Sequence, residues 1–331
     1  LRKTGEVMMG ELPLLSLSFG EAIAIPTGGL IPNGADAVVM AEDTSLTADW
    51  VEVRKGVQSG ENIIRAGEEF AAGTKVLSQG DCVDFRSVSL LASLGINEVP
   101  VVDLRISILS TGDEILPADT ADLPPGKVRD VNGWSVYSLL KHFGFAPEYR
   151  GIICDERDVF ERTVNAELDI CDVLILSGGS SVGVRDHCSS VLEKLPSPGL
   201  IVRGINMVPG KPTLIAGCSE SKKLAISLPG HPVSCLTVAF TVLLPLLMRL
   251  IGRENVTFCR KLHLPVTRDI TAKTGPEEFF PFKLSEDGLA EPIMAKSGYI
   301  SVFSDSDGLI RIASDMETIR SGETAEVWLW R

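Results

Sequence analysis

The sequence predicts a multi-domain α/β plus β protein, in which a central parallel α/β domain is flanked by small β domains. The chain has 331 residues, about twice the length of a typical single domain. Between residues 104 and 252, short apolar runs alternate with helical stretches, which is typical of a parallel sheet covered by helices. Before and after this segment, short strands separated by turn residues indicate β structure.

The N-terminal part is predicted to hold two small domains. Residues 1–64 form a β-rich domain, in which "AVVMAE" and "WVEVRKG" are predicted to be antiparallel strands. Residues 65–103 form a linking domain with one helix. In that helix Val88, Leu91 and Ala92 recur at the spacing of one helical face, and the glycine at position 95 ends it.

The predicted α/β domain comprises residues 104–252, and its helices are placed by their apolar faces. A helix at 134–143 is indicated by one apolar face, made of Val136, Leu139, Leu140 and Phe143. Another helix is predicted at 157–168, and Asp155, near its start, is a capping candidate.

The last predicted domain, residues 253–331, is a small β-barrel. Its strands are predicted in "KLHLPVTRDI", "EFFPFKLSEDG", "GLIRIAS" and "ETAEVWLW". An uncharged run of 17 residues starts at Pro232, just before this domain. A membrane span needs about 20 apolar residues, and Pro245 lies near the end of the run, so we expect a buried helix packed on the sheet.

Charge and cysteine content restrict the classes of partner and site. The net charge of −13 disfavours nucleic acid and an anionic membrane surface as partners. The seven cysteines are scattered and form no CxxC pair, which indicates reduced core thiols in a cytoplasmic protein. His231 and Cys235 are spaced so that both could bind a metal from one helix face, but no second such pair exists, which argues against zinc.

Five predicted strands end in polar turns or in turns rich in glycine and proline. The fourth of these strands is "IVRGINMV". In a parallel sheet the carboxyl ends of the strands lie along one edge, where ligands bind, so these turns should converge into a binding crevice. The turn residues are Thr111, Gly112, Asp113 and Glu114; Cys154 and Asp155; Gly178, Gly179, Ser180, Ser181, Gly183 and Asp186; Pro209, Gly210, Lys211 and Pro212; and Pro229, Gly230, His231 and Pro232.

The turn "SGGSSVGVRD" (177–186) has the composition of an anion-binding loop. Glycines let backbone N–H groups approach an anion, serines add hydroxyl donors, and a following helix adds the positive end of its dipole. The expected ligand therefore carries phosphate. The spacing matches neither GxxxxGK[ST] nor GxGxxG, which argues against a P-loop and a Rossmann dinucleotide site.

The charged residues of these turns have two interpretations each. The acids are Asp113, Glu114, Asp155 and Asp186. Each could cap a helix, and for Asp155 alone capping is favoured. Together at one edge they could bind Mg²⁺, which takes one or two carboxylates plus substrate phosphate oxygens. Lys211 is either a cation for phosphate or a solvated surface lysine, and His231 either donates to an oxyanion or caps the following helix.

Six stretches are distinctive in combination. They are "PTGGLIPNGADAVVM" (26–40), "IRAGEE" (64–69), "LSTGDEI" (109–115), "SGGSSVGVRD" (177–186), "VPGKP" (208–212) and "LPGHPVS" (228–234). Together they resemble the MoeA-type molybdopterin molybdenumtransferases, the family that includes the C-terminal domain of gephyrin. The segment "KSGYISVFSDSDGLIRI" (296–312) resembles the C-terminal β domain of that family.

The resemblance implies insertion of molybdate into the dithiolene of adenylylated molybdopterin, with Mg²⁺ and release of AMP. It implies a MogA-like, molybdopterin-binding α/β domain, and a homodimer whose cleft lies between this domain of one subunit and the first β domain of the other. Residues 178–183 are expected to hold phosphate, and Asp155 and Asp186 to hold Mg²⁺. The residues implied in handling substrate, metal or molybdate are Thr27, Glu114, Asp155, Asp186, Lys211, Pro229 and Pro232.

The sequence departs from the pattern of the family at several points. His231 stands where the family usually has Asn, Val208 where Lys is frequent, and Glu69, a predicted substrate contact, where Asp is commoner. The "MDGYA" motif of the family is expected in a segment ahead of Leu1. Three alternatives follow: a tungstate-preferring insertase, adenylylation of molybdopterin as in a related single-domain family without flanking β domains, and a non-catalytic pterin-binding or scaffold paralogue.

Overall fold

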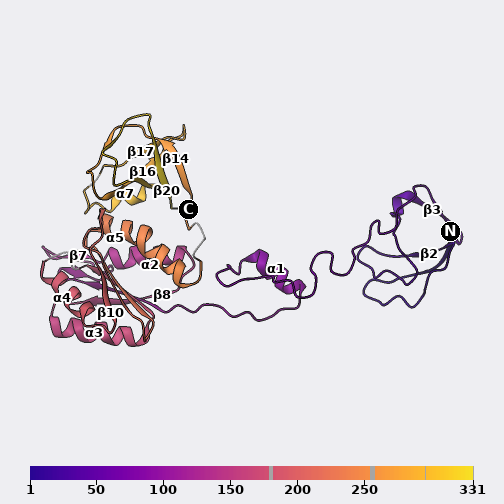
Figure 1. Cartoon of the computed structure of the whole chain (residues 1–331), viewed down its shortest axis with the longest axis horizontal. Coiled ribbons are helices and arrows are strands. Elements are labelled where there is room, and N and C mark those ends of the chain that lie inside the picture. Colours follow the sequence, from indigo (N-terminus) through magenta and orange to yellow (C-terminus); the bar gives the residue numbers. More distant parts are fainter. Residues whose placement is uncertain (179–181, 254–257, 295, 331) are drawn as a thin grey trace. The chain divides into compact units, whose positions relative to one another are not determined.

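The computed structural model describes residues 1–178, 182–253, 258–294 and 296–330, apart from the side chains of residues 182–186. The chain divides into two compact units, Leu1–Ser78 and Gln79–Arg331. Figure 1 shows both units, coloured along the sequence. The finer division into four domains stays a prediction.

The first unit is built on a four-stranded sheet in the order β2-β1-β4-β3. Its elements are β1 (Arg2–Glu6), β2 (Glu21–Ala24), the 3₁₀ helix η1 (Ala41–Asp43), β3 (Thr44–Thr47) and β4 (Trp50–Val53). β3 and β4 pair antiparallel, as predicted for "WVEVRKG", whereas β1 and β2 run parallel.

The predicted strand at "AVVMAE" is wrong. The N–H of Val38 donates to the carbonyl of Glu61 at 3.1 Å, and the carbonyl of Val38 accepts from Asn62 Nδ2 at 2.8 Å. Because a turn takes up the backbone groups of Val38, they are not available for a neighbouring strand.

The helix predicted from Val88, Leu91 and Ala92 is α1 (Phe85–Ser93), in the second unit. Its cap is Asp84, whose Oδ1 accepts from the N–H groups of the residues two and three positions further on, at 3.0 and 3.1 Å. The sequence analysis predicted the helix and missed this cap, which satisfies two of the N–H groups left open at a helix start.

The central sheet has six strands in the order β10-β12-β13-β9-β5-β8. They are β5 (Ile106–Thr111), β8 (Pro147–Ile153), β9 (Val173–Gly178), β10 (Pro198–Arg203), β12 (Leu214–Cys218) and β13 (Lys223–Leu228). β13, β9, β5 and β8 are parallel, whereas β12 is antiparallel to both of its neighbours. The sheet is therefore mixed, because the short turn at 219–222 joins β12 to β13 without a crossover helix.

Helices cover both faces of this sheet (Figure 1). They are α2 (Asn132–His142), α3 (Arg157–Ile170), α4 (Val182–Glu193) and α5 (Pro232–Val238). Successive strand residues point to opposite faces. Val173 and Ile175 accordingly join the core under α2 and α5, while Leu174 and Leu176 join the core under α3 and α4.

The uncharged run from Pro232 forms one continuous helix, made of α5, the π-helical turn η2 (Ala239–Leu243) and α6 (Leu244–Leu250). The wider turn directly precedes Pro245, which cannot fit an undisturbed α-helix. In the part of the chain that the structure describes, this is the one helix long and apolar enough to cross a membrane. Phe240 and Leu247 within it are completely buried, which confirms the prediction of a core helix.

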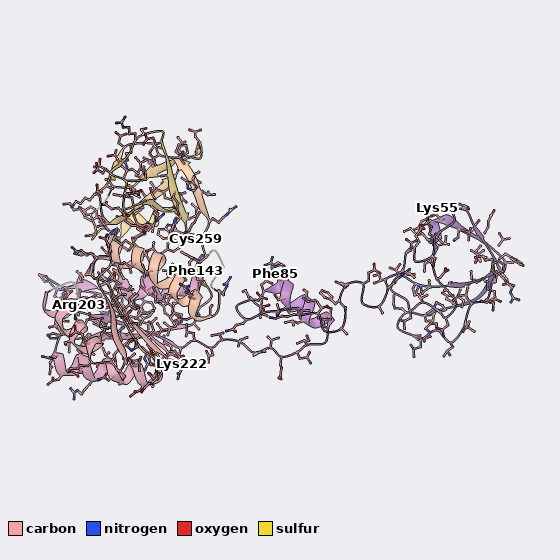
Figure 2. All side chains as sticks on the ribbon, viewed as in Figure 1. Lys55, Phe85, Phe143, Arg203, Lys222 and Cys259 are labelled. Atoms are coloured by element: carbon pink, nitrogen blue, oxygen red, sulfur yellow. The ribbon has the colours of Figure 1, made fainter. Side chains whose placement is uncertain are left out.

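The C-terminal part is a β structure, as predicted. Its elements are β14 (Lys261–Pro265), β15 (Ile270–Thr271), β16 (Glu277–Leu284), β17 (Ala290–Pro292), the short helix α7 (Ser301–Ser304), β18 (Gly308–Ile312), β19 (Thr318–Ile319) and β20 (Thr324–Leu329). Aromatic rings join it to the core helix: Phe240 lies 5.3 Å from Phe258 and 4.6 Å from Trp330 between ring centroids. Phe143 and Cys259, both labelled in Figure 2, belong to the same core.

Candidate functional site

The carboxyl ends of the parallel strands meet at one edge of the central sheet, as predicted. In the strand registers Thr111 pairs with both Ile153 and Gly178, and Leu228 pairs with Ser177. β12 runs the other way, so its first residue lies at this edge too. The carboxyl edge, as we call it, comprises residues 111–114, 153–155, 177–178, 204–213 and 228–232.

The fourth turn follows a different strand arrangement from the one predicted. "IVRGINMV" is not a single strand, because β10 ends at Arg203 and a separate strand, β11 (Met207–Val208), pairs with β16. Gly204 stands between them with a φ of +83°, a conformation that interrupts an extended run. The turn still lies at the carboxyl edge, since Arg203 pairs with Leu214 at the start of β12.

Asp113 and Asp155 each accept a hydrogen bond from the backbone of the other. The N–H of Asp155 donates to Asp113 Oδ1 at 3.0 Å, and the N–H of Asp113 donates to Asp155 Oδ2 at 3.4 Å. Burial raises the pKa of the Asp155 carboxyl, and the negative charges of Asp113 and Glu114 add to this effect. Three of the four predicted acids therefore lie together.

Asp155 does not cap the helix that follows it, so this interpretation is wrong. The residue at the N-cap position of α3 is Glu156, and no side chain makes a capping hydrogen bond there. The carboxylate of Asp155 is instead turned toward the loop after β5, where it accepts from Asp113.

Buried polar atoms without a hydrogen-bond partner among the described residues stand at this edge. Two of them are Thr111 Oγ1 and Asp155 Oδ1, and Thr111 is only 1% exposed. A third is Nδ1 of His187 in α4, a residue that also lowers the pKa of Asp155. Leaving such an atom unpaired costs about 1–3 kcal/mol, so these groups are suited to receive a ligand. The sequence analysis missed His187, although it directly follows Asp186.

Glycine is needed at two predicted positions for steric reasons. Gly178 has a φ of +122°, and a Cβ there would stand 2.2 Å from the carbonyl oxygen of Thr111. Gly112 has a φ of +143°, a backbone conformation that residues with a side chain rarely adopt. The bare backbone lets neighbouring turns approach closely.

Part of the predicted anion-binding loop lies outside the described residues. This holds for Gly179, Ser180 and Ser181, and for the side chain of Asp186. Gly183 lies in the first turn of α4. The phosphate role of the loop and the metal role of Asp186 stay predictions.

The turn that carries Lys211 is fixed at its base. Thr213 Oγ1 donates to the carbonyl of Gly210 at 2.7 Å, and Gly210 is buried. Pro209 and Pro212 are half-buried, whereas Lys211 is exposed. Both interpretations of Lys211 fit this position.

The turn after β13 has contacts that the sequence analysis did not identify. The carbonyl of Gly230 accepts from Asn132 Nδ2 at 2.7 Å. His231 occupies the N-cap position of α5, but its side chain makes no capping hydrogen bond; its Nδ1 lies 3.2 Å from Ser297 Oγ. The capping interpretation of His231 is therefore wrong.

The start of α5 is held between prolines and the C-terminal β structure. Pro229 is buried, and Pro232 occupies the first turn of the helix, where a missing N–H costs nothing. The N–H of Val233 donates to the carbonyl of Ser297 at 3.0 Å. Sequence reasoning had no signal for Ser297, which stands 66 residues after His231.

The metal-ligand pair considered at the start of α5 does not form. Cys235 is 1% exposed within the core, where burial raises its pKa, whereas His231 is exposed. Among the described residues no group of three or more His, Cys, Asp or Glu side chains could hold a metal ion. Mg²⁺ does not need such a group, since it binds one or two carboxylates together with phosphate oxygens. The unpartnered oxygen of Asp155 fits that chemistry.

Two predicted site residues belong to the first unit. Thr27 is exposed in the turn after β2, which is closed by a hydrogen bond of 2.9 Å from the N–H of Gly29 to the carbonyl of Pro26. Glu69 is exposed in a turn near the end of this unit. The other predicted site residues belong to the second unit, and the roles of Thr27 and Glu69 stay predictions.

Three family profiles match the chain in order. Residues 2–95 match the MoeA N-terminal region (domain I and II), residues 107–249 match a "Probable molybdopterin binding domain", and residues 263–330 match the MoeA C-terminal region (domain IV). These matches confirm the predicted fold class, in which a molybdopterin-binding α/β domain is flanked by β domains.

Similar proteins carry the same assignment over most of the chain. A molybdopterin biosynthesis protein of Methanocaldococcus jannaschii is 33% identical, over 95% of this chain and 77% of its own. The molybdopterin molybdenumtransferase of Bacillus subtilis is 31% identical, over 94% and 73%. A crystal structure of the MoeA protein of Pyrococcus horikoshii superposes with a TM-score of 0.85 at 32% identity, covering 100% of this chain and 81% of the other. The transferase is favoured over the non-catalytic alternative, and the chain belongs to the MoeA family of molybdopterin molybdenumtransferases.

Proposed function

We propose that this chain inserts molybdate into the dithiolene of adenylylated molybdopterin and releases AMP. The observation that carries the proposal is the carboxyl edge, where buried, unpartnered oxygens of Thr111 and Asp155 stand at the ends of adjacent strands. This edge belongs to the part of the chain that matches the molybdopterin binding domain. A polar crevice at the strand ends of an α/β sheet is the usual place for such a ligand.

The phosphates of the substrate are proposed to lie over residues 178–183. The approach of the backbone at Gly178 and the helix that starts at Val182 support this, since N–H groups at a helix start attract an anion. The Thr111 hydroxyl is a buried donor beside this loop, and Lys211 is an exposed cation at the same edge.

Asp155 and Asp186 are proposed to hold Mg²⁺ with the substrate phosphates. When bound, the ion would neutralise phosphate charge and polarise the bond to AMP. The protein contributes a carboxylate whose orientation is fixed by the Asp113 N–H. Glu114 and Thr27 are proposed to act in catalysis, and the remaining predicted contacts to bind the substrate.

The assembly of the protein, its location and its partners are also proposed. The active form is proposed to be a homodimer whose cleft lies between the α/β domain of one subunit and the first β domain, which carries Thr27, of the other. Cytoplasmic location is supported by free thiols at all seven cysteines. The net charge of −13 supports small-molecule partners rather than nucleic acid or membrane.

The test is AMP release from adenylylated molybdopterin with Mg²⁺ and either molybdate or tungstate. Molybdate-dependent release is expected from the wild type and a loss of at least a hundredfold from Asp155→Asn and Asp186→Asn. Asp158→Asn, which removes an exposed carboxylate in the first turn of α3, is the matched control and should keep the wild-type rate. Tight binding of the substrate without release under either oxyanion would contradict the proposal, and faster release with tungstate would change the assigned metal.

A further inference from the structure

Asp130 lies next to β5, just below the carboxyl edge. After β5 the chain forms a loop that contains two short strands, and it returns to the side of β5 at Asp130. β6 (Ile115–Leu116) and β7 (Val128–Arg129) pair, and the N–H of Asp130 donates to the carbonyl of Leu116 at 2.8 Å. Asp130 is 3% exposed and stands two residues before the first residue of α2.

The carboxylate of Asp130 joins three neighbouring strands. Its Oδ2 accepts from Ser110 Oγ of β5 at 2.6 Å and from the Tyr149 hydroxyl of β8 at 2.7 Å. Its Oδ1 accepts from the N–H of Gly133 at 3.0 Å. Ser110 Oγ in turn lies 3.0 Å from Ser177 Oγ of β9. Hydrogen bonds to a carboxylate are stronger than neutral ones, so the strand ends are held in one register.

The packing around this network leaves no room for variation. A Cβ at position 133 would stand 2.6 Å from Asp130 Oδ2 and 2.7 Å from Ser110 Oγ, so only glycine fits there. The ring of Trp134 lies 4.8 Å from that of Tyr149, which fixes the direction of the phenol. Burial raises the pKa of Tyr149, so its hydroxyl remains a donor.

A second buried side chain from the same segment holds the turn after β13. Asn132, the first residue of α2, is 6% exposed, and its Nδ2 donates to the carbonyl of Gly230 at 2.7 Å. Asn132 and Asp130 stand two residues apart, so one short segment contacts β5, β8 and the turn after β13, and reaches β9 through Ser110.

We infer that Asp130 and Asn132 are positioning residues, which set the geometry of the turns that bind the substrate. Asp130 contacts Ser110, which precedes the predicted substrate contact Thr111. Ser110 contacts Ser177, which precedes Gly178. Asn132 contacts Gly230, itself a predicted substrate contact. A buried charged group contributes little stability compared with apolar side chains of the same shape, so the benefit of this network lies in the geometry that it fixes. A displacement of 1 Å at a substrate contact can cost about a hundredfold in rate. The inference rests on the proposed function, because positioning has kinetic consequences only where these turns bind substrate.

The experiment compares Asn132→Ala and Asp130→Asn with Glu167→Gln, measuring kcat and KM for AMP release together with the melting temperature. Glu167 is 9% exposed in the same domain and accepts from Arg150 at 3.0 Å, but it lies in α3 and not at the carboxyl edge. The two network variants should raise KM for adenylylated molybdopterin at least tenfold. Glu167→Gln should lower the melting temperature about as much as the two network variants do. It should leave KM and kcat within twofold of the wild type.

Two further measurements keep the inference testable. If a network variant does not fold, Tyr149→Phe removes one of the three donors to Asp130 and should raise KM about threefold, a smaller effect than full loss of the network. Folded variants with unchanged KM and kcat would overturn the inference. If the wild type releases no AMP, the proposed function alone fails, and the dissociation constants of wild type and variants for adenylylated molybdopterin then decide on the positioning role.

Discussion

At Gly178 two neighbouring strands come so close that a methyl group would overlap a carbonyl oxygen. Gly178→Ala combines this clash of 2.2 Å with a φ of +122°, so we expect it to lower the free energy of unfolding by about 3 kcal/mol or more. Gly144→Ala is the matched control, because Gly144 has a φ of +85° and open space around its Cβ position. Its cost should stay near 1 kcal/mol, the strain of the backbone alone.

Urea unfolding of Gly178→Ala and Gly144→Ala separates the cost of the steric clash from the cost of backbone strain. Equal losses would mean that the space beside Gly178 opens more easily than the structure indicates. The comparison matters for the site, because Gly178 carries the turn that is proposed to hold phosphate.

Residue-level interpretation from sequence was sound where a residue acts on its neighbours in the chain. The glycines of the strand-end turns were predicted for their bare backbone, and Gly112 and Gly178 have the positive φ that requires it. Asp155 was misjudged as a cap, because the choice between its own helix and the distant loop of Asp113 depends on the pairing of β5 with β8.

At the scale of elements, the start of α1 depends on one charged cap. Hydrogen bonds from the Arg86 side chain and from two N–H groups lower the pKa of Asp84 to about 2, below its ordinary value of 3.8. Because the folded-state pKa is the lower one, the contribution of the cap is present above about pH 4 and is lost as the pH falls toward 2.

Hydrogen exchange across Phe85–Ser93 measures this effect. Asp84→Ala should speed exchange about fivefold at pH 6, whereas Asp84→Asn should stay close to the wild type because Asn is an equally good cap. Near pH 2 and below, the wild type should lose most of its advantage over Asp84→Ala. An advantage that persists there would show that hydrogen bonds to the ionised carboxylate of Asp84 are not what holds the helix start.

The core helix packs apolar side chains at the junction between the central sheet and the C-terminal β structure. Phe240 is completely buried between the rings of Phe258 and Trp330, so Phe240→Ala should cost about 4 kcal/mol. Leu250→Ala, at the half-exposed end of the same helix, should cost under about 1 kcal/mol. Urea midpoints of the two variants check this, and a small loss for Phe240→Ala would mean that the junction repacks readily.

Elements were predictable where local periodicity decides them. The apolar face of α2 follows from its spacing, and its residues belong to the core or pack against it. The core helix follows from the length of its uncharged run and is buried as predicted. The segments "AVVMAE" and "IVRGINMV" were misread, because their structure is set by distant partners: the turn at Glu61 and Asn62 in one case, and β16 in the other.

For the whole molecule, burial sorts the cysteines by reactivity. Cys82 and Cys154 are exposed, while burial raises the pKa of Cys188 to about 12 and that of Cys259 to about 11. Brief treatment with iodoacetamide at pH 8 should therefore modify Cys82 and Cys154 before the buried Cys188 and Cys259, since the thiolate is the reactive form. Peptide mapping by mass spectrometry identifies the modified sites.

The same two thiols can report on the proposed site. Cys154 directly precedes Asp155 at the carboxyl edge, whereas Cys82 precedes α1. Adenylylated molybdopterin with Mg²⁺ should slow alkylation of Cys154 and leave that of Cys82 unchanged. Protection of both thiols, or of neither, would argue against substrate binding at this edge.

The site as a whole was predictable only in part. The topology rule for parallel sheets placed the strand-end turns together, and the register of the strands confirms it. His187, Asn132 and Ser297 were missed because their importance comes from packing between elements. No local pattern announces a buried amide that bonds a carbonyl 98 residues away.

The reversed direction of β12 has a practical consequence at the far side of the sheet. Its turn into β13, at 219–222, lies opposite the carboxyl edge, and Figure 2 shows Lys222 and Arg203 toward different ends of the sheet. Within this turn Glu220, Ser221 and Lys222 are exposed to solvent. Exposed turns of this kind tolerate inserted peptides. An affinity tag inserted there would tether the protein to a surface while its crevice faces the solution.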